Sequence, residues 1–182
     1  MYEPSEIPPG LVPPSGCLKH ATVQLTDPTE LQQRLNALGK GANVTGSVIG
    51  IALSYDADPR GFVSAIALST ITSSLLVDVT NKSGTAEGKR ILKSFLCGGG
   101  INIVAVEMAR VALRVFLHLK VPLKGVDAMD YFTHKDPNLS RIGQVVWKKV
   151  EHRVRIDEVD ELWDGPQDTA FGAILRAWIT AR

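Results

Sequence analysis

The chain has 182 residues, of which 45% are hydrophobic and 21% charged, and its formal net charge is +1 at pH 7. This length suits one domain with its own core, and the charge balance excludes recruitment to nucleic acid or membrane by overall charge. The two cysteines, Cys17 and Cys97, have no metal-ligand spacing, and no apolar run is long enough to cross a membrane. We therefore expect an intracellular globular protein with structural thiols and no membrane association.

The N-terminal part of the sequence predicts an arm followed by a domain. Residues 1–19 are rich in proline and lack periodicity, which predicts an extended arm, and residues 20–182 form the expected domain. His20–Leu25 predicts an edge strand. A helix is expected to begin near Pro28, where leucines start to recur at helical spacing, and to end at residues 39–41, which hold two glycines.

The stretch over residues 44–79 predicts three consecutive strands. Its apolar runs VIGIAL, FVSAIAL and SSLLVDV are short and rich in β-branched or aliphatic side chains, which favours strands over helices. Turn residues separate the runs, at Asp58–Gly61 and at Ser69–Ser73. Because both linkers are short, the sequence predicts an antiparallel meander at the centre of an α/β domain.

The elements after the meander are expected to alternate between helix and strand. Thr85–Leu96 predicts an amphipathic helix, and the fully apolar Ile101–Val106 predicts a strand with a parallel neighbour. Glu107–Leu119 predicts a buried helix, and Lys120–Asp127 a short fifth strand. The last helix, Gln167–Ala181, has an apolar stripe at i, i+3, i+4 and i+7, so one of its faces should pack on the core.

Three segments carry a resemblance to a known family. Val48–Tyr55, Val63–Leu68 and Leu75–Val79 match strand patterns of the form V-I-G-x-D-x-E, V-S-x-I-Q-L and V-x-L-x-D-V, and Asp168–Trp178 matches the pattern D-A-x-x-x-L-x-x-W. The chain resembles the RNase D and Werner type of 3′-5′ exonuclease domain, whose metal site is built from Asp, Glu, Asp and Asp. The resemblance implies a ribonuclease-H-like fold, with a mixed five-stranded sheet and helices on both faces.

The acidic residues of the family motif are missing at most of the matched positions. Ala52 stands where the first Asp would be and Ser54 where the Glu would be. Val111 or Ala112 stands at the second Asp, depending on how the helix is aligned. We therefore expect the site to be filled or apolar.

The remaining matched positions lie at the start of the last helix. Asp168 corresponds to the fourth metal carboxylate, although its place also suits a helix N-cap. Asp164 replaces the Tyr or His that would position the attacking water. Hydrolysis of a phosphodiester by two metals needs several carboxylates on a rigid frame, because two dications must be neutralised side by side. The resemblance thus predicts a pseudo-exonuclease without metal or other cofactor, and not an enzyme.

Two other features are candidate functional sites, namely a histidine and a group of basic residues. His118 lies in an apolar helix and is interpreted as a packed histidine rather than a metal ligand. Basic residues gather on the predicted helix 141–155, and they are the candidate nucleic-acid contacts: Lys148, Lys149, His152, Arg153 and Arg155. The alternative is a solvated face balanced by the acidic residues that follow over 157–161.

These observations predict a catalytically inactive exonuclease-like domain that serves as a binding or scaffold module in RNA metabolism. Its expected partner is a protein of an RNA-processing complex, with RNA itself and a second copy of the chain as further candidates. One alternative is a module that binds only protein, for assembly or dimerisation. The other is an active nuclease that assembles its metals from a non-standard set of carboxylates, namely Asp56, Asp58, Asp127 and Asp168.

Overall fold

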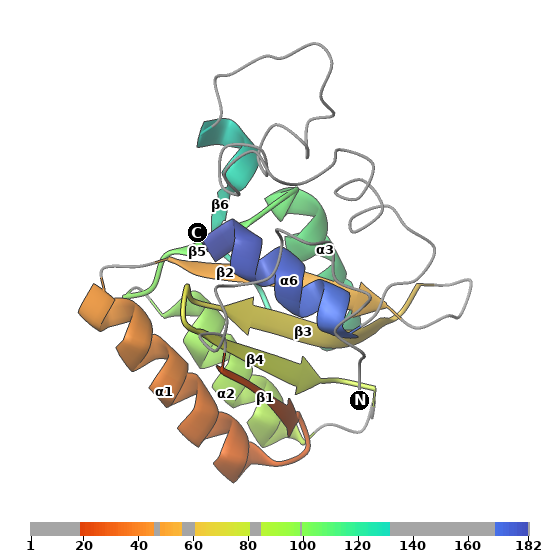
Figure 1. Ribbon diagram of the computed structural model, residues 1–182. Helices are drawn as coiled ribbons and strands as arrows, with labels where there is room; N and C mark the ends of the chain where they lie inside the picture. The colour runs from red at the N-terminus through yellow and green to blue at the C-terminus, as the bar shows by residue number, and fades with distance from the viewer. Residues whose placement is uncertain are drawn as a thin grey trace.

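The computed structural model describes residues 19–45, 48–55, 61–80, 85–98, 100–131 and 170–181. Six strands form one sheet in the order β1-β4-β3-β2-β5-β6 (Figure 1). The strands are β1 (Lys19–Gln24), β2 (Ile49–Tyr55), β3 (Val63–Ser69), β4 (Ser73–Asp78), β5 (Ile103–Ala105) and β6 (Val126–Asp127). The helices are α1 (Pro28–Thr45), α2 (Ala86–Cys97), α3 (Met108–Leu119) and α6 (Ala170–Ala181), with a 3-10 turn at Ala128–Tyr131.

The predicted meander forms the centre of the sheet. β2 pairs antiparallel with β3, and β3 pairs antiparallel with β4. The turn between β3 and β4 is closed by Thr70, whose N–H donates to the carbonyl of Ser73 at 2.8 Å. Its hydroxyl also accepts from the N–H of Ser73 at 3.1 Å. Two strands after the meander extend the sheet in parallel, since β5 pairs with β2 and β6 pairs with β5. The predicted ribonuclease-H-like α/β fold is therefore confirmed.

The sheet has six strands rather than the predicted five. The additional strand is β1, which pairs in parallel with β4 along its whole length. The sequence here predicted an edge strand. It did not predict which strand β1 would pair with, because among its described side chains only Val23 is deeply buried. The fifth predicted strand, Lys120–Asp127, is also much shorter in the structure, where only Val126–Asp127 pair with β5.

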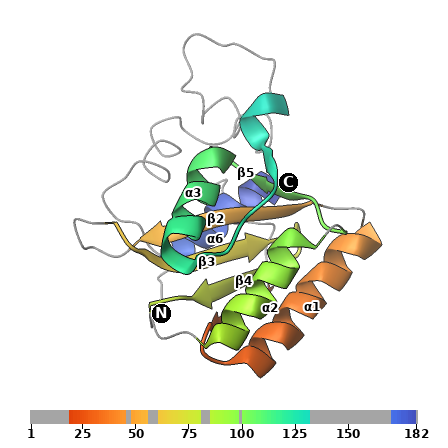
Figure 2. The same ribbon diagram turned by 180° about the vertical axis from the view of Figure 1, so that it is seen from behind.

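Helices cover both faces of the sheet, as predicted. α1, α2 and α3 lie on one face and α6 on the other (Figures 1 and 2). The larger core combines leucines of α1 with Leu92 of α2 and Val115 of α3. The smaller core lies between α6 and the opposite face of the meander. Trp178 of α6 is buried in the predicted stripe, and its indole N–H donates to the carbonyl of Ile71 at 3.1 Å. The last helix thus also closes the β3–β4 turn.

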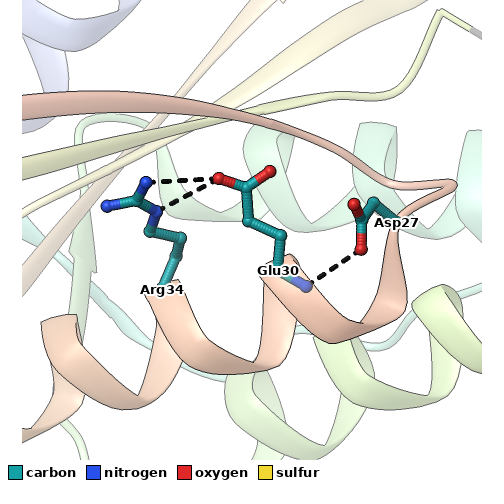
Figure 3. A network of polar contacts seen from close by, with 3 residues as sticks. All are labelled: Asp27, Glu30 and Arg34. Atoms are coloured by element: carbon teal, nitrogen blue, oxygen red, sulfur yellow. Dashed lines mark hydrogen bonds and ion pairs between the residues drawn. The ribbon is translucent and has the colours of Figure 1, made fainter.

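Helix α1 begins as the sequence predicts but ends later. The carboxylate of Asp27 accepts from the N–H of Glu30 at 2.9 Å and caps the first turn (Figure 3). Glu30 then pairs with Arg34 at 3.2 Å, one turn further along the same face. These local contacts explain why the helix begins at Pro28, as the sequence predicted.

The predicted end of this helix at residues 39–41 was wrong, because α1 continues to Thr45. A glycine inside a helix costs only about 1 kcal/mol, and tertiary packing overrides that cost. At Gly39 the packing is visible, because an added Cβ would lie 3.4 Å from Ile101 and 3.4 Å from Phe95 of α2. Gly39 therefore marks a close approach of α1 to its neighbours rather than a helix end.

Helix α2 agrees with the prediction. Thr85 is its N-cap, and its hydroxyl accepts from the N–H of Gly88 at 3.0 Å. Gly88 itself lies against the end of β1, since an added Cβ would overlap with the carbonyl oxygen of Leu25. The glycine therefore lets the first turn of α2 pack against the chain between β1 and α1.

Helix α3 is not buried as a whole, which corrects a second prediction. One side of α3 carries Met108, Val111, Val115 and Leu119, which are buried against the sheet. The other side carries three large apolar side chains that remain about half exposed: Leu113, Phe116 and Leu117. The sequence of this helix has apolar residues on nearly all sides, so it does not show whether the helix is buried on every side or leaves one apolar side exposed to solvent. Of the described helices, none is long and apolar enough to cross a membrane.

Asp78 connects the edge strand β1 to the rest of the sheet. Its carboxylate accepts from the side-chain amide of Gln24 at 2.8 Å across the β1–β4 pair. It also accepts from the N–H of Thr80 at 2.9 Å and from the hydroxyl of Thr80 at 2.6 Å. Burial raises the pKa of this carboxyl, but the hydrogen bonds from Thr80 and Gln24 outweigh burial and lower the pKa below its ordinary value of 3.8.

This lowered pKa predicts that Asp78 stabilises the fold above pH 3.8 and that the contribution is lost as the pH falls through the folded-state pKa. The folded carboxylate binds its proton less readily than the unfolded one, so acid favours unfolding. Asp78→Asn should therefore melt below wild type at pH 6, and the gap should narrow in steps down to pH 2.5. A gap that stays constant over this range would contradict the assignment.

Candidate functional site

The two positions that the sequence resemblance matches to an acidic pair lie at the centre of the sheet. Ala52 and Ser54 belong to β2, between β3 and β5, and as alternate residues they share one face of the strand. Ala52 is paired with Ala67 and Ser54 with Ala65 of β3. Both side chains are buried, with 7% and 3% of their surface exposed. The two positions matched from the sequence are therefore neighbours in the structure, on the face of the sheet that α6 covers.

The surroundings of Ala52 are apolar. Its methyl group belongs to the small core between the sheet and α6, whose other members are Ala65, Ala67, Leu76, Ala173, Ile174 and Ala177. Four of these side chains are single methyl groups, so α6 lies close to the sheet. No member offers an oxygen to a cation. This agrees with the expectation of a filled, apolar site.

Gly50 allows this close approach at the start of the same strand. A Cβ at this position would overlap with the carbonyl oxygen of Ala177 and would lie 2.7 Å from the N–H nitrogen of Ala181. Both groups are backbone of α6, so neither can rotate away as a side chain could. The glycine of the V-I-G pattern is therefore required by the packing of α6 across β2.

A buried arginine on α6, Arg176, lies beside Ala52 and Ser54, and no sequence motif indicated it. Arg176 has 8% of its surface exposed, and its Nη2 donates to the carbonyl oxygen of Leu53 at 2.5 Å. Leu53 is the residue between Ala52 and Ser54. A guanidinium group thus lies at the strand segment that holds Ala52 and Ser54. The available signal was a single charged residue within the otherwise uncharged helix Ala170–Ala181.

The hydroxyl of Ser54 takes part in hydrogen bonding within the sheet. The hydroxyl of Ser64 donates to it at 3.2 Å. Ser64 reaches this position because the register between β2 and β3 shifts after Ser54, leaving Tyr55 opposite Val63. A neutral hydroxyl that is held in this way is a poor substitute for a metal-bridging carboxylate.

Neither candidate for the second Asp supplies an acidic group. Val111 and Ala112 are neighbours in α3, and they face different surroundings. Val111 is buried in the larger core, on the opposite face of the sheet from Ala52. Ala112 is partly exposed. Whichever of the two residues is matched, the position holds a hydrocarbon side chain that cannot bind a metal. The choice changes only whether that side chain is buried or partly exposed.

Asp127 was a member of the non-standard ligand set, and both of its oxygens are engaged with backbone. Its Oδ2 accepts from the N–H of Met108 at 2.9 Å, at the first residue of α3. Its Oδ1 accepts from the N–H of Met129 at 3.0 Å. The residue before α3, Glu107, has a left-handed backbone and makes no side-chain cap. Asp127 therefore takes the role of the N-cap for α3 from the neighbouring strand.

His118 is a packed histidine, as interpreted from the sequence. Its Nδ1 accepts from the N–H of Val63 at 3.1 Å, at the first residue of β3. Its ring also meets Phe62 edge-on, with the two ring centroids 5.2 Å apart. The contact joins α3 to the start of β3.

The other candidate residues lie outside the described part of the chain. These are the metal-site positions Asp164 and Asp168, the acidic residues Asp56 and Asp58, and the basic residues Lys148, Lys149, His152, Arg153 and Arg155. The arm over residues 1–18 lies outside it as well. Within the described ranges, no three His, Cys, Asp or Glu side chains gather as a possible metal-ligand set.

The donor set at the described positions does not fit a pair of divalent cations. Such a pair needs hard, negatively charged oxygens that converge on one point. The positions offer a methyl group at Ala52, a hydrogen-bonded hydroxyl at Ser54 and an aliphatic side chain on α3. Between the first two, the backbone carbonyl of Leu53 accepts from the guanidinium of Arg176.

The sequence matches no protein-family model and no curated protein. Among solved structures, the chain is similar to Escherichia coli RNase D, an exoribonuclease involved in structured RNA processing. The TM-score is 0.59 at 12% identity, over 87% of this chain and 42% of RNase D. It is also similar to the EXD2 exonuclease domain soaked in Mg, with a TM-score of 0.50 at 16% identity over 85% of this chain and 86% of that domain. At these identities the likeness concerns the fold, so the chain has the fold of the RNase D and EXD2 type of 3′-5′ exonuclease domain.

Proposed function

We propose that this chain is a catalytically inactive 3′-5′ exonuclease-like domain that acts as a binding or scaffold module in RNA metabolism. The observation that carries the proposal is that the buried positions on β2 hold no carboxylate. Ala52 and Ser54 stand at the positions of the first acidic pair, and the guanidinium of Arg176 donates to the carbonyl between them. Two-metal hydrolysis depends on negatively charged oxygens at this place, and neither the methyl group of Ala52 nor the hydroxyl of Ser54 supplies one.

The proposal predicts no nuclease activity on single-stranded or duplex RNA or DNA, with Mg²⁺ or Mn²⁺. End-labelled substrates should remain at full length on denaturing gels under conditions in which RNase D shortens them. A 3′-end trimming activity that needs metal and disappears in Asp168→Ala would overturn the proposal. The Asp168 variant is needed as well, because it separates activity of this chain from a contaminating nuclease.

An active nuclease with a non-standard ligand set is the less favoured alternative. It requires Asp127 together with Asp56, Asp58 and Asp168. Both oxygens of Asp127 accept backbone N–H groups of Met108 and Met129, so the structure already accounts for this carboxylate as a cap of α3. Titration with Mn²⁺, followed by calorimetry, distinguishes this alternative from the proposal, since it alone predicts saturable binding of two metal ions.

The RNA part of the proposal rests on the likeness to RNase D, and fold alone is weak support for a ligand. A module that binds only protein is the second alternative, and the exposed apolar side of α3 favours it. Anisotropy with a labelled single-stranded RNA at low and high salt separates the two. If the basic residues at 148–155 contact phosphates, affinity falls steeply with salt, and Lys148→Glu with Arg155→Glu reduces the slope.

A further inference from the structure

The exposed side of α3 carries a compact apolar stripe. Leu113, Phe116 and Leu117 are spaced as i, i+3 and i+4, so they lie together on one face of the helix. Their exposed fractions are 57%, 48% and 51%, against 40% for Ile71, the one other large apolar side chain that is exposed among the described residues. We call Leu113, Phe116 and Leu117 the α3 stripe. Three large side chains held half in water on one helix face are typical of a binding surface.

Basic side chains surround the α3 stripe. The sequence from Met108 to Val126 contains no acidic residue but holds four positively charged ones, Arg110, Arg114, Lys120 and Lys124. Arg110 is paired with Glu107 at 3.0 Å, whereas Lys120 lies over the ring of Phe116, with its Nζ 5.6 Å from the ring centroid. Arg114 lies over the ring of Tyr55, 5.9 Å from its centroid. The stripe is thus apolar at the centre, and Lys120 places a positive charge at its rim.

We propose that the α3 stripe is a docking surface for an amphipathic helix of a partner protein whose apolar side is flanked by Asp and Glu. An apolar stripe on a helix is matched by the apolar side of another helix laid against it. Acidic flanks would face Lys120, which lies over the ring of Phe116, and Arg114 on the same helix, which gives the contact its charge complementarity. This surface rests on the proposed function as a binding module and names the chemical class of its protein partner.

Other occupants fit the α3 stripe less well. A second copy of the chain, bound through the same face, would place the basic rim against itself, because symmetric contacts pair a patch with its own copy. RNA would need exposed aromatic faces for stacking, but two of the three side chains are leucines, and Lys120 lies over the ring of the third. The charge and the shape of the surface therefore favour an acidic helix.

The test is selection from displayed libraries of 20-residue helices. One library combines a leucine and isoleucine stripe with Glu and Asp flanks, and its matched library has Lys and Arg flanks instead. We expect binders to the full chain from the acidic library only, measured afterwards as free peptides by fluorescence anisotropy. Leu113→Ala with Leu117→Ala should weaken the selected peptide by about tenfold or more. Ile71→Ala, at the remote β3–β4 turn, should leave its affinity unchanged.

Several results would overturn the proposal: equal enrichment from the basic library, no enrichment from either library, or a loss of affinity in Ile71→Ala equal to that in the stripe variant. So would a dimer in sedimentation that the stripe variant abolishes, or RNA binding lost in the same variant. Binding that appears only after neutralising the chain's own acidic residues at 157–161 would mean that this stretch occupies the face. A nuclease-active chain that still binds the peptide would refute the proposed function and leave the α3 stripe standing.

Discussion

Gly50→Ala is expected to lower the free energy of unfolding by about 3 kcal/mol or more, because a single added methyl group would collide with the backbone of α6. For a chain of this size, the loss corresponds to a fall in Tm of roughly 6 to 12 °C. The collision involves the carbonyl oxygen of Ala177 and the N–H nitrogen of Ala181, so relief requires α6 to shift as a whole. Thermal unfolding followed by circular dichroism measures the effect.

Gly41→Ala is the matched control for this substitution. It adds the same methyl group within helix α1, where no atom lies within 4 Å of the new Cβ. Replacing a helical glycine by alanine should stabilise the protein by up to about 1 kcal/mol. The two glycine variants should therefore change Tm in opposite directions. If Gly50→Ala melts at or above the wild-type temperature, the placement of α6 across β2 is wrong.

Restoring the acidic pair, by Ala52→Asp together with Ser54→Glu, is expected to lower the free energy of unfolding in EDTA by about 3 kcal/mol or more. Both carboxylates would be placed in a buried site whose neighbours are mostly alanine methyl groups. Burying a carboxylate costs several kcal/mol unless it is paired and hydrogen-bonded, and two carboxylates on one strand face would also repel each other. The double variant should therefore melt well below wild type at pH 7.

The amide variant, Ala52→Asn with Ser54→Gln, is the control that separates charge from volume. It adds side chains of nearly the same size without ionisable groups, so the difference in Tm between the two variants reports the cost of the charges. This difference should shrink as the pH falls and the carboxylates take up protons. If the acidic variant melts no lower than the amide variant in EDTA, these positions do not lie side by side in a buried, apolar site.

Much of the fold was contained in short-range patterns. The three strands of the meander followed from apolar runs of strand length between turn residues, and the turn at Thr70 closes as the sequence predicted. The starts of α1 and α2 were predictable because they depend on local contacts: the side chains of Asp27 and Thr85 each bind an N–H only three residues away. The strand pattern also placed Ala52 and Ser54 as alternate residues of one strand, and the structure has both of them in β2.

The errors concern features that depend on distant contacts. Helix α1 continues beyond Gly39 and Gly41 because α2 packs against it. The α3 stripe remains about half exposed because the sheet covers only the other side of α3. Neither outcome is written in the local sequence, since both depend on what lies opposite the helix. The pairing of β1 with β4 likewise joins segments that are 54 residues apart at Gln24 and Asp78.

The sequence by itself therefore determined where most of the helices and strands form, because helix caps, turns and apolar periodicity act over a few residues. Only the tertiary structure decided what surrounds the replaced positions. The guanidinium of Arg176 reaches the carbonyl of Leu53 from a residue 123 positions further along the chain. That contact exists because Gly50 lets α6 lie directly on β2, and the packing of two backbones cannot be read from either segment alone.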